Sequence, residues 1–363
     1  MKKLGISVYP HHSSMEEVKQ YIDMAGKLGF KRVFTCMLSA SGKKEDIVNE
    51  FTTLCQYAHQ YEMEVSVDTN ERVFKELGAS PYDLSLFKDM GVDIIRLDGH
   101  FGEVEDIEIT KNQYNIKIEY NSSATVAIDH MLLNGANRFN MCLCANFYPQ
   151  RYTGMGLERF NQLKEFYRPL GLDNASFVSS QQPHTHGPWK VYEGLPTLEM
   201  HRDWPIDVQL RHLIALGYDK DFIVGNAYAS YEELESLAKT NLNKISVKVN
   251  CFDDISDVEK NIIEFAHHSH RDDCNELVVR SSAPRVAFKG QSIPVRTVEK
   301  EYFEVGDVII VNDNLEHYRG ELMIVKQPIK VVPTYNLVGT INTMEQHIVD
   351  CILPRYSFEL IVA

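Results

Sequence analysis

The sequence predicts an α/β fold, a (β/α)₈ TIM barrel followed by a small, mostly β domain. Short apolar runs alternate with amphipathic segments of helix length through about the first 240 residues, and eight such units match the length and rhythm of a barrel. After Leu242 the rhythm changes to short β-rich runs separated by turns. The 363 residues also exceed the roughly 250–300 that one hydrophobic core supports. We therefore expect a barrel domain at residues 1–241 and a β domain at residues 242–363.

Eight apolar runs are the predicted barrel strands, and most end at polar or turn-forming residues. They cover residues 4–8, 32–37, 64–67, 93–97, 115–120, 139–144, 175–179 and 222–224. The first helix is expected to begin after Ser13 or Ser14, because a serine cap is followed there by acidic residues, and to stop at Gly29. A doubly wound open sheet is the alternative fold. No Gly-x-Gly-x-x-Gly segment follows the first strand, so the usual dinucleotide site of that fold is not supported.

The second domain is predicted to contain one helix and several short strands. The helix covers about residues 258–266, and turns such as Lys289-Gly290 and Arg319-Gly320 separate the strands. The strands cover residues 277–280, 286–288, 295–298, 307–311, 321–325 and 358–362. Closely spaced strands of this kind are typical of a small barrel or sandwich.

Composition restricts the partners and the compartment. A formal net charge of −14 argues against a broad nucleic-acid-binding face, which needs clustered Lys and Arg. No stretch approaches the roughly 18 apolar residues of a membrane span, and the first residues do not resemble a signal peptide. Of the seven cysteines, Cys142 and Cys144 lie in an apolar strand, where reduced core thiols are expected. We expect a soluble cytoplasmic protein with no nucleic-acid partner, no membrane partner and no cofactor.

The ends of the predicted strands are unusually polar. In a (β/α)₈ barrel the active site lies at the C-terminal ends of the strands. Asp and Asn are also common turn residues, but their recurrence on most of the strands favours a functional site. The candidates are Tyr9, Asp68, Asn70, Asp98, Glu119, Asn121, Asn146, Tyr148, Gln181 and Asn226.

Two loops, at residues 146–154 and 181–189, add to this site. Loops after strands seven and eight of such barrels often bind phosphate. Arg151 is suited to a bidentate phosphate contact, with His184 or His186 sharing the charge. The His184-x-His186 pair also suits a metal-dependent hydrolase, but the first strand offers no second His-x-His, and we expect no metal. Glu199 and Asp203 lie in a later loop, either as site acids or as partners of a neighbouring arginine.

Several segments along the chain resemble those of bacterial 6-phospho-N-acetylmuramidases. They are Gly5-Ile6-Ser7-Val8-Tyr9-Pro10, Val67-Asp68-Thr69-Asn70, Arg96-Leu97-Asp98-Gly99, Asn146-Phe147-Tyr148-Pro149, Gln182-Pro183-His184-Thr185-His186-Gly187-Pro188, Arg280-Ser281-Ser282 and Gly306-Asp307. The resemblance implies a TIM barrel with a cyclophilin-like β domain. It also implies a glycosidase of peptidoglycan recycling, which releases N-acetylmuramic acid 6-phosphate from a disaccharide with N-acetylglucosamine.

Carboxylate chemistry fits such an enzyme, because most glycosidases use a pair of carboxyl groups as acid and as nucleophile or base. Asp68 and Asp98 are the first candidate pair, since both follow strands on one rim. Glu119 is the third candidate, since its alternation with Asn121 puts both on one strand face. Attack by the 2-acetamido group of the substrate is the alternative to a carboxylate nucleophile.

Two other classes of function stay open from the residues alone. A regulatory protein would use the same pocket to bind a sugar phosphate, and a metal-dependent hydrolase or lyase would use it for other chemistry. The second domain either covers the barrel mouth or makes the contact of a homodimer.

Overall fold

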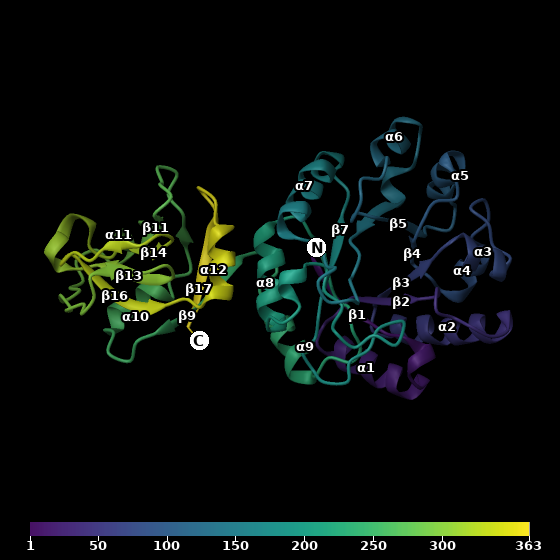
Figure 1. The fold of residues 1–363 in the computed structure, drawn as a ribbon, viewed down its shortest axis with the longest axis horizontal. Helices are drawn as coiled ribbons and strands as arrows, with labels where there is room; N and C mark the ends of the chain where they lie inside the picture. Colours follow the sequence, from purple (N-terminus) through teal and green to yellow (C-terminus); the bar gives the residue numbers. More distant parts are fainter. Residues whose placement is uncertain (363) are drawn as a thin grey trace. The chain divides into compact units, whose positions relative to one another are not determined.

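A computed structural model describes residues 1–362, which form two compact units (Figure 1). The first unit comprises Met1–Leu210 and Tyr218–Thr240. The second comprises Arg211–Gly217 and the residues from Asn241 onward. No helix among residues 1–362 is long and apolar enough to cross a bilayer.

Eight parallel strands close into a barrel in the first unit, in the order β1 to β8. Their bounds are β1 Lys3–Ser7, β2 Arg32–Cys36, β3 Glu64–Thr69, β4 Ile94–Leu97, β5 Lys117–Asn121, β6 Met141–Cys144, β7 Asn174–Val178 and β8 Asp221–Val224. β8 pairs with β1 and so closes the ring. The barrel predicted from the sequence is confirmed, with strand ends displaced by at most a few residues.

Helices surround these strands (Figure 1). They are α1 Met15–Lys27, α2 Lys44–His59, α3 Glu71–Leu77, α4 Ser85–Met90, α5 Glu103–Glu108, α6 Ile128–Leu133, α7 Leu157–Tyr167, α8 Ile206–Leu216 and α9 Tyr231–Ala238. Ser14 caps α1 and forms a reciprocal capping box with Glu17, which confirms the predicted start of the first helix.

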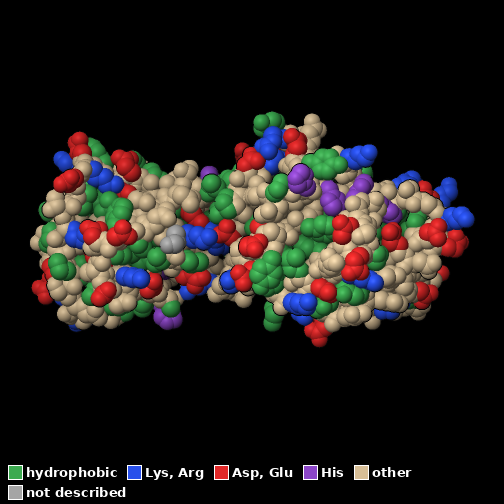
Figure 2. Space-filling view, turned by 90° about the horizontal axis from the view of Figure 1, so that it is seen from below, with side chains coloured by type: hydrophobic (Ala, Val, Ile, Leu, Met, Phe, Trp, Pro, Cys, Tyr) green, Lys and Arg blue, Asp and Glu red, His purple; other side chains and the backbone are tan. Residues whose placement is uncertain are grey.

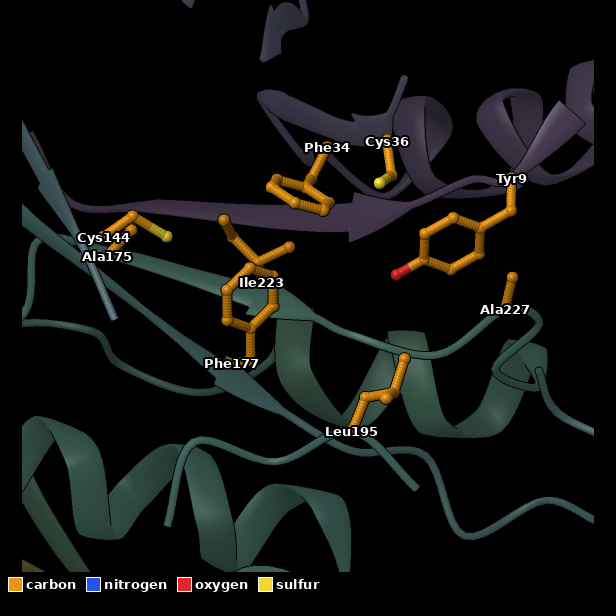
Figure 3. Close-up of a cluster of buried hydrophobic side chains, with 9 residues drawn as sticks. All are labelled: Tyr9, Phe34, Cys36, Cys144, Ala175, Phe177, Leu195, Ile223 and Ala227. Atoms are coloured by element: carbon orange, nitrogen blue, oxygen red, sulfur yellow. The ribbon is translucent and has the colours of Figure 1, made fainter. Parts of the chain in front are cut away.

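The barrel interior is divided into an apolar part and a charged part. One apolar cluster consists of side chains from β2, β6, β7 and β8 and from the segments that follow β1, β7 and β8, and Figure 3 shows Phe34, Phe177 and Ile223 at its centre. Side chains of β3, β4 and β5 supply instead the buried charges Asp68, Arg96 and Glu119. Because alternate residues of a strand point inward, each of these charges belongs to the barrel lumen and not to the helix layer.

The second unit is built on a seven-stranded sheet in the order β10-β17-β9-β16-β13-β14-β11, with a two-stranded sheet of β12 and β15. The strands are β9 Ile245–Cys251, β10 His268–Ser269, β11 Val278–Ser281, β12 Tyr302–Phe303, β13 Asp307–Val311, β14 Leu322–Val325, β15 Ile329–Lys330, β16 Tyr335–Thr340 and β17 Ser357–Val362. Its helices are α10 Asp257–Ile263, α11 Ala283–Ala287 and α12 Thr343–Asp350, with a 3₁₀ segment η6 at Asp313–Tyr318. The mostly β second domain is therefore confirmed.

Two strands predicted in this unit are wrong. Residues 286–288 lie in and directly after helix α11, where Pro284 occupies the first turn and begins a helix at no hydrogen-bonding cost. Residues 295–298 form no strand, although the backbone N–H of Arg296 is bound by the side chain of Asn336. The Asn336 side chain there accepts the hydrogen bond that a neighbouring strand would accept in the predicted β-sheet.

Asp219, just before β8, makes the stability of the barrel unit depend on pH. It is buried, its Oδ1 accepts from Asn174 at 2.5 Å and Ser176 at 2.9 Å, and its Oδ2 has no hydrogen-bond partner within residues 1–362. Burial raises its pKa to about 7, whereas an unfolded aspartate ionises near pH ~3.9. Between these values the folded state holds the proton more strongly, so stability falls as the pH rises, by up to ~1.4 kcal/mol per pH unit.

We expect the Asp219→Asn variant to lose this slope. Its free energy of unfolding, relative to that of the wild type, should rise by about 2–3 kcal/mol between pH 5 and pH 8. Urea unfolding followed by tryptophan fluorescence measures it, because Trp189 and Trp204, the two tryptophans of the chain, belong to the barrel unit. Parallel pH curves for the two proteins would contradict the assignment.

Candidate active site

Two aspartates lie at the C-terminal ends of adjacent strands. Asp68 belongs to β3 and is buried, whereas Asp98 directly follows β4 and is exposed. The backbone N–H of Asp98 donates to the carbonyl of Thr69 at 2.8 Å, which fixes the end of β4 beside the end of β3. Asp68 is in register with Arg96, and Asp98 is two residues further along the same strand face. The two carboxyl groups therefore belong to consecutive layers at the barrel mouth.

Burial gives Asp68 an unusual acidity. Its Oδ1 accepts a hydrogen bond from Arg96 Nη1 at 2.6 Å, and the thiol of Cys36 lies 3.8 Å from Oδ2. Burial raises the pKa of Asp68; the Arg96 guanidinium opposes this effect, and the charges of Asp98 and Glu119 add to it. The net direction is upward, so this carboxyl group keeps its proton to a higher pH than an ordinary aspartate does.

Arg96 links the aspartates to the next loop. Its Nη2 donates to Oδ1 of Asn146, and its Nε is buried without a hydrogen-bond partner within the described residues. Asn146 is held further by its backbone N–H, which donates to Ser123 Oγ at 2.7 Å. The candidate residues chosen from the sequence did not include Arg96. Its signal was its position two residues before Asp98, which puts it on the same face of β4.

Glu119 lies elsewhere in the barrel. Its carboxylate is fully buried, and Arg32 Nη2 donates to both of its oxygens at 2.7 Å. Arg32 also binds Asp221 through Nη1 at 3.0 Å. Arg32 and Asp221 are the first residues of their strands, so this group lies toward the opposite end of the barrel. Glu119 does share a strand face with Asn121, but it lies one layer deeper in the barrel. The prediction that Glu119 lies with the two aspartates at the mouth does not fit this geometry.

The loop after β7 meets the start of the chain at His186. The backbone of His186 pairs with that of Ala227, and its Nε2 lies 3.2 Å from Ser13 Oγ. Its ring is 5.6 Å from Tyr228 and 6.2 Å from His12 between centroids, and Figure 2 shows several histidines gathered on the surface of the barrel. Burial, together with His12, lowers the pKa of His186, which favours the neutral imidazole. His186 is therefore suited to hydrogen bonding more than to balancing a phosphate charge.

Five of the predicted polar residues are engaged in holding the loops. Tyr9 is buried and its hydroxyl donates to the Gly225 carbonyl at 2.5 Å; burial keeps its pKa well above the usual range. Asn70 caps α3, and Asn121 accepts from the Ser123 N–H. Gln181 donates to two backbone carbonyls, and Asn226 binds both backbone groups of Ser180 and the hydroxyl of Thr185. These side chains shape the mouth, because their hydrogen bonds are already made within the protein.

The predicted phosphate ligand Arg151 is already neutralised. Its guanidinium donates to both carboxylate oxygens of Asp203, at 2.7 and 3.0 Å, and lies 4.0 Å from Glu193. His184 is exposed and has a left-handed backbone (φ 68°). Tyr148, in the same loop as Arg151, is half-buried.

Glu199 fixes this loop in place. It accepts two hydrogen bonds from Arg202 at 2.7 Å and one each from the backbone N–H groups of Tyr152 and Gly154. The hydrogen bonds from Arg202 and then from the backbone lower its pKa to about 2. A carboxylate this acidic is not a proton donor at neutral pH. The geometry therefore favours Glu199 as the ion-pair partner of Arg202 over Glu199 as a site acid.

A cavity of about 400 Å³ lies between the segment after β2 and helices α2 and α3. One lining residue, Met37, donates its backbone N–H to the Asp68 carbonyl at 2.9 Å. Two cations, Lys44 and Arg72, line the cavity, and Arg72 also contacts Glu76 at 2.9 Å. The remaining lining residues are Ala40, Ser41, Gly42, Ile47, Val73, Glu76 and Leu77. Sequence reasoning missed both cations, because they belong to helices α2 and α3 and not to strand ends.

Two family models match nearly the whole chain. The N-terminal model of 6-phospho-N-acetylmuramidase matches residues 4–239, and the C-terminal model matches residues 245–361. No curated protein matches the chain.

Solved structures also resemble it. An uncharacterized B. cereus protein is 37% identical, covers 99% of both chains and has a TM-score of 0.90. A conserved Enterococcus faecalis protein is 24% identical, with a TM-score of 0.70 over 99% of this chain and 96% of that one, and supports the fold alone.

The family models cover the barrel with its acidic mouth and the β unit alike, and so confirm the resemblance seen in the sequence. The chain therefore belongs to the 6-phospho-N-acetylmuramidases, glycosidases that hydrolyse phosphorylated N-acetylmuramyl–N-acetylglucosamine in cell-wall recycling.

Proposed function

We propose that Asp68 and Asp98 carry the glycosidase reaction at the barrel mouth. The observation that carries this assignment is their contrast: neighbouring carboxyl groups of which one is buried with a raised pKa and the other is exposed. Pairs of titratable groups in such different environments are typical of acid and base assignments in enzymes.

Asp68 acts as the general acid in this proposal. Arg96 holds its Oδ1, so the proton resides on Oδ2 and passes to the glycosidic oxygen as the bond to the anomeric carbon breaks. Asp98 stabilises the positive charge that develops on the sugar, either as the attacking group or by orienting the substrate's acetamido group. Water finally adds its hydroxyl to the anomeric carbon and returns its proton to Asp68.

The cavity between α2 and α3 suits the substrate's 6-phosphate better than the loop of Arg151 does. Its lining residue Met37 donates its backbone N–H to the Asp68 carbonyl. Lys44 and Arg72 also line the cavity, and the Lys44 ammonium makes no hydrogen bond within residues 1–362. The charge of Arg151 is instead balanced by Asp203 and Glu193. We accordingly assign phosphate recognition to Lys44 and a loop-holding role to Arg151. Arg72 is paired with both carboxylate oxygens of Glu76, at 2.9 and 3.1 Å, as Arg151 is with those of Asp203.

Replacing Lys44 tests this assignment. The Lys44→Met variant should raise KM for the phosphorylated disaccharide about tenfold to hundredfold, since a charge-assisted hydrogen bond contributes about 1.5–3 kcal/mol, and should leave kcat nearly unchanged. Lys43→Met is the matched control, because Lys43 is equally exposed and does not line the cavity. If Arg151→Met abolished the preference for phosphate and Lys44→Met did not, the phosphate would belong to the loop after β6.

Turnover of synthetic 6-phospho-N-acetylmuramyl–N-acetylglucosamine, beside its unphosphorylated twin and with and without a chelator, tests the reaction itself. We expect cleavage of the phosphorylated disaccharide alone, at a rate that the chelator does not change. Cleavage of neither compound would refute the substrate.

We further propose that the enzyme works in the cytoplasm. All seven cysteines are free thiols, and Cys36, Cys55, Cys142 and Cys144 are buried. Such cysteine usage is typical of a reducing compartment.

A further inference from the structure

The second unit has a cavity of its own, with a volume of about 360 Å³. It lies over one face of the sheet, where Arg280 of β11 pairs with Met323 of β14 and the backbone of Val311 pairs with that of Glu321. Its walls continue the apolar core of this unit. The lining residues are Asn275, Leu277, Val278, Arg280, Val311, Leu315, Tyr318, Glu321, Met323, Ile329 and Tyr335.

One buried carboxylate oxygen of a lining residue is without an aligned hydrogen bond. Glu321 is 4% exposed, and its Oε1 has no hydrogen-bond partner within residues 1–362. Arg280 Nε lies 3.1 Å from it and forms an ion pair, but this nitrogen is likewise without an aligned hydrogen bond. A buried oxygen left in this state costs free energy that a ligand N–H or O–H group would recover.

Two tyrosines and an apolar floor complete the cavity. Tyr318 is 38% exposed, and its ring is held by the Arg285 guanidinium at 5.1 Å and by the edge of His317 at 4.9 Å. Tyr335 also lines the cavity and is half-buried. Tyrosine rings combine an apolar face with a hydroxyl group, so they suit ligands that are apolar on one side and polar at the edges.

These features define the ligand. The volume is near the lower end of the ~300–1,000 Å³ of small-molecule sites, which suits a single ring. Arg280 and Glu321 form an ion pair, so neither side chain offers an uncompensated charge to a charged ligand. The buried carboxylate of Glu321 also repels an anion. The ligand is therefore neutral. Glu321 requires donor groups, and the apolar floor accepts a methyl group. We propose that this cavity binds a neutral N-acetylhexosamine, the class of sugar that the family's reaction releases beside the phosphorylated product.

Isothermal titration calorimetry of N-acetylglucosamine into the intact chain tests the proposal. We expect saturable binding that weakens at least tenfold for glucose, which lacks the acetamido methyl, and for N-acetylglucosamine 6-phosphate, which carries a charge. The variants Tyr318→Ala and Glu321→Gln should each weaken the binding of N-acetylglucosamine at least tenfold. Their kcat for the disaccharide should stay at the wild-type value, so failure of this site is distinguishable from failure of the barrel site.

Tyr302→Ala is the matched control, because Tyr302 is an exposed tyrosine of the same unit outside the cavity. Because Tyr318 is the partly exposed last residue of η6, its variant keeps the test valid even if Glu321→Gln fails to fold. Binding that persists undiminished in Tyr318→Ala would place the sugar at the barrel mouth alone and overturn the proposal. A missing heat of binding in the wild type, or cavity-dependent binding of an apolar dipeptide in place of the sugar, would overturn it as well.

Discussion

Replacing Asp98 by asparagine is expected to lower kcat for the phosphorylated disaccharide by a factor of roughly 10²–10⁴, which is the usual contribution of a positioned acid or base. The side chain is exposed at the end of β4, so the amide fits the same space and the fold should be unaffected. The amide keeps the size of the carboxylate but cannot carry the negative charge that stabilises the sugar cation. Substrate affinity should therefore change much less than kcat.

The measurement is a comparison of kcat, KM and the thermal unfolding midpoint for wild type and variant. Asp129→Asn serves as the control, because Asp129 is an exposed aspartate in the first turn of α6. If Asp98→Asn retained full kcat while Asp68→Asn lost it, Asp68 would act with a group other than Asp98. If the Asp98 variant lost affinity for the substrate without losing kcat, Asp98 would bind the sugar and take no part in the chemistry.

The barrel could be predicted because each of its strands leaves a signal in its own short segment of sequence. A parallel strand that is buried on both faces requires a continuous apolar run, and runs such as residues 32–37 and 139–144 stand out against their amphipathic neighbours. The second unit was harder to predict. β12 and β15 have two residues each, and no pattern in so short a segment separates a strand from a turn.

The candidate site was predictable to the same extent. Asp98 and Asp68 stand directly at strand ends, where the fold itself brings side chains together. Alternation along a strand gives the face of a residue but not its height in the barrel, so Glu119 was grouped with the mouth. The ion pair that holds Glu119 comes from Arg32, 87 residues earlier in the chain, and no local pattern announces it. The cations Lys44 and Arg72 were missed because they belong to helices α2 and α3, whereas the candidates were sought at strand ends.

Replacing Arg32 by methionine is expected to lower the free energy of unfolding of the barrel by about 3–5 kcal/mol, because it leaves the buried Glu119 carboxylate without its partner. Asp221 loses its partner in the same variant. The double variant Arg32→Met with Glu119→Gln should recover a large part of this loss, since an amide at position 119 carries no charge to be compensated. Tryptophan fluorescence during urea unfolding measures these changes in the barrel unit, which contains both tryptophans.

Lys239→Met is the control for this pair, because the exposed Lys239 forms an ion pair with the half-buried Glu235 at the surface of the α9 region. Its loss should cost no more than about 0.5 kcal/mol, since water already screens both charges. The same variants decide the role of Glu119. A core ion pair predicts that Glu119→Gln loses stability and that its folded fraction keeps its kcat. A catalytic Glu119 predicts the reverse, a stable protein with kcat reduced by orders of magnitude, and that outcome would return Glu119 to the reaction beside the two aspartates.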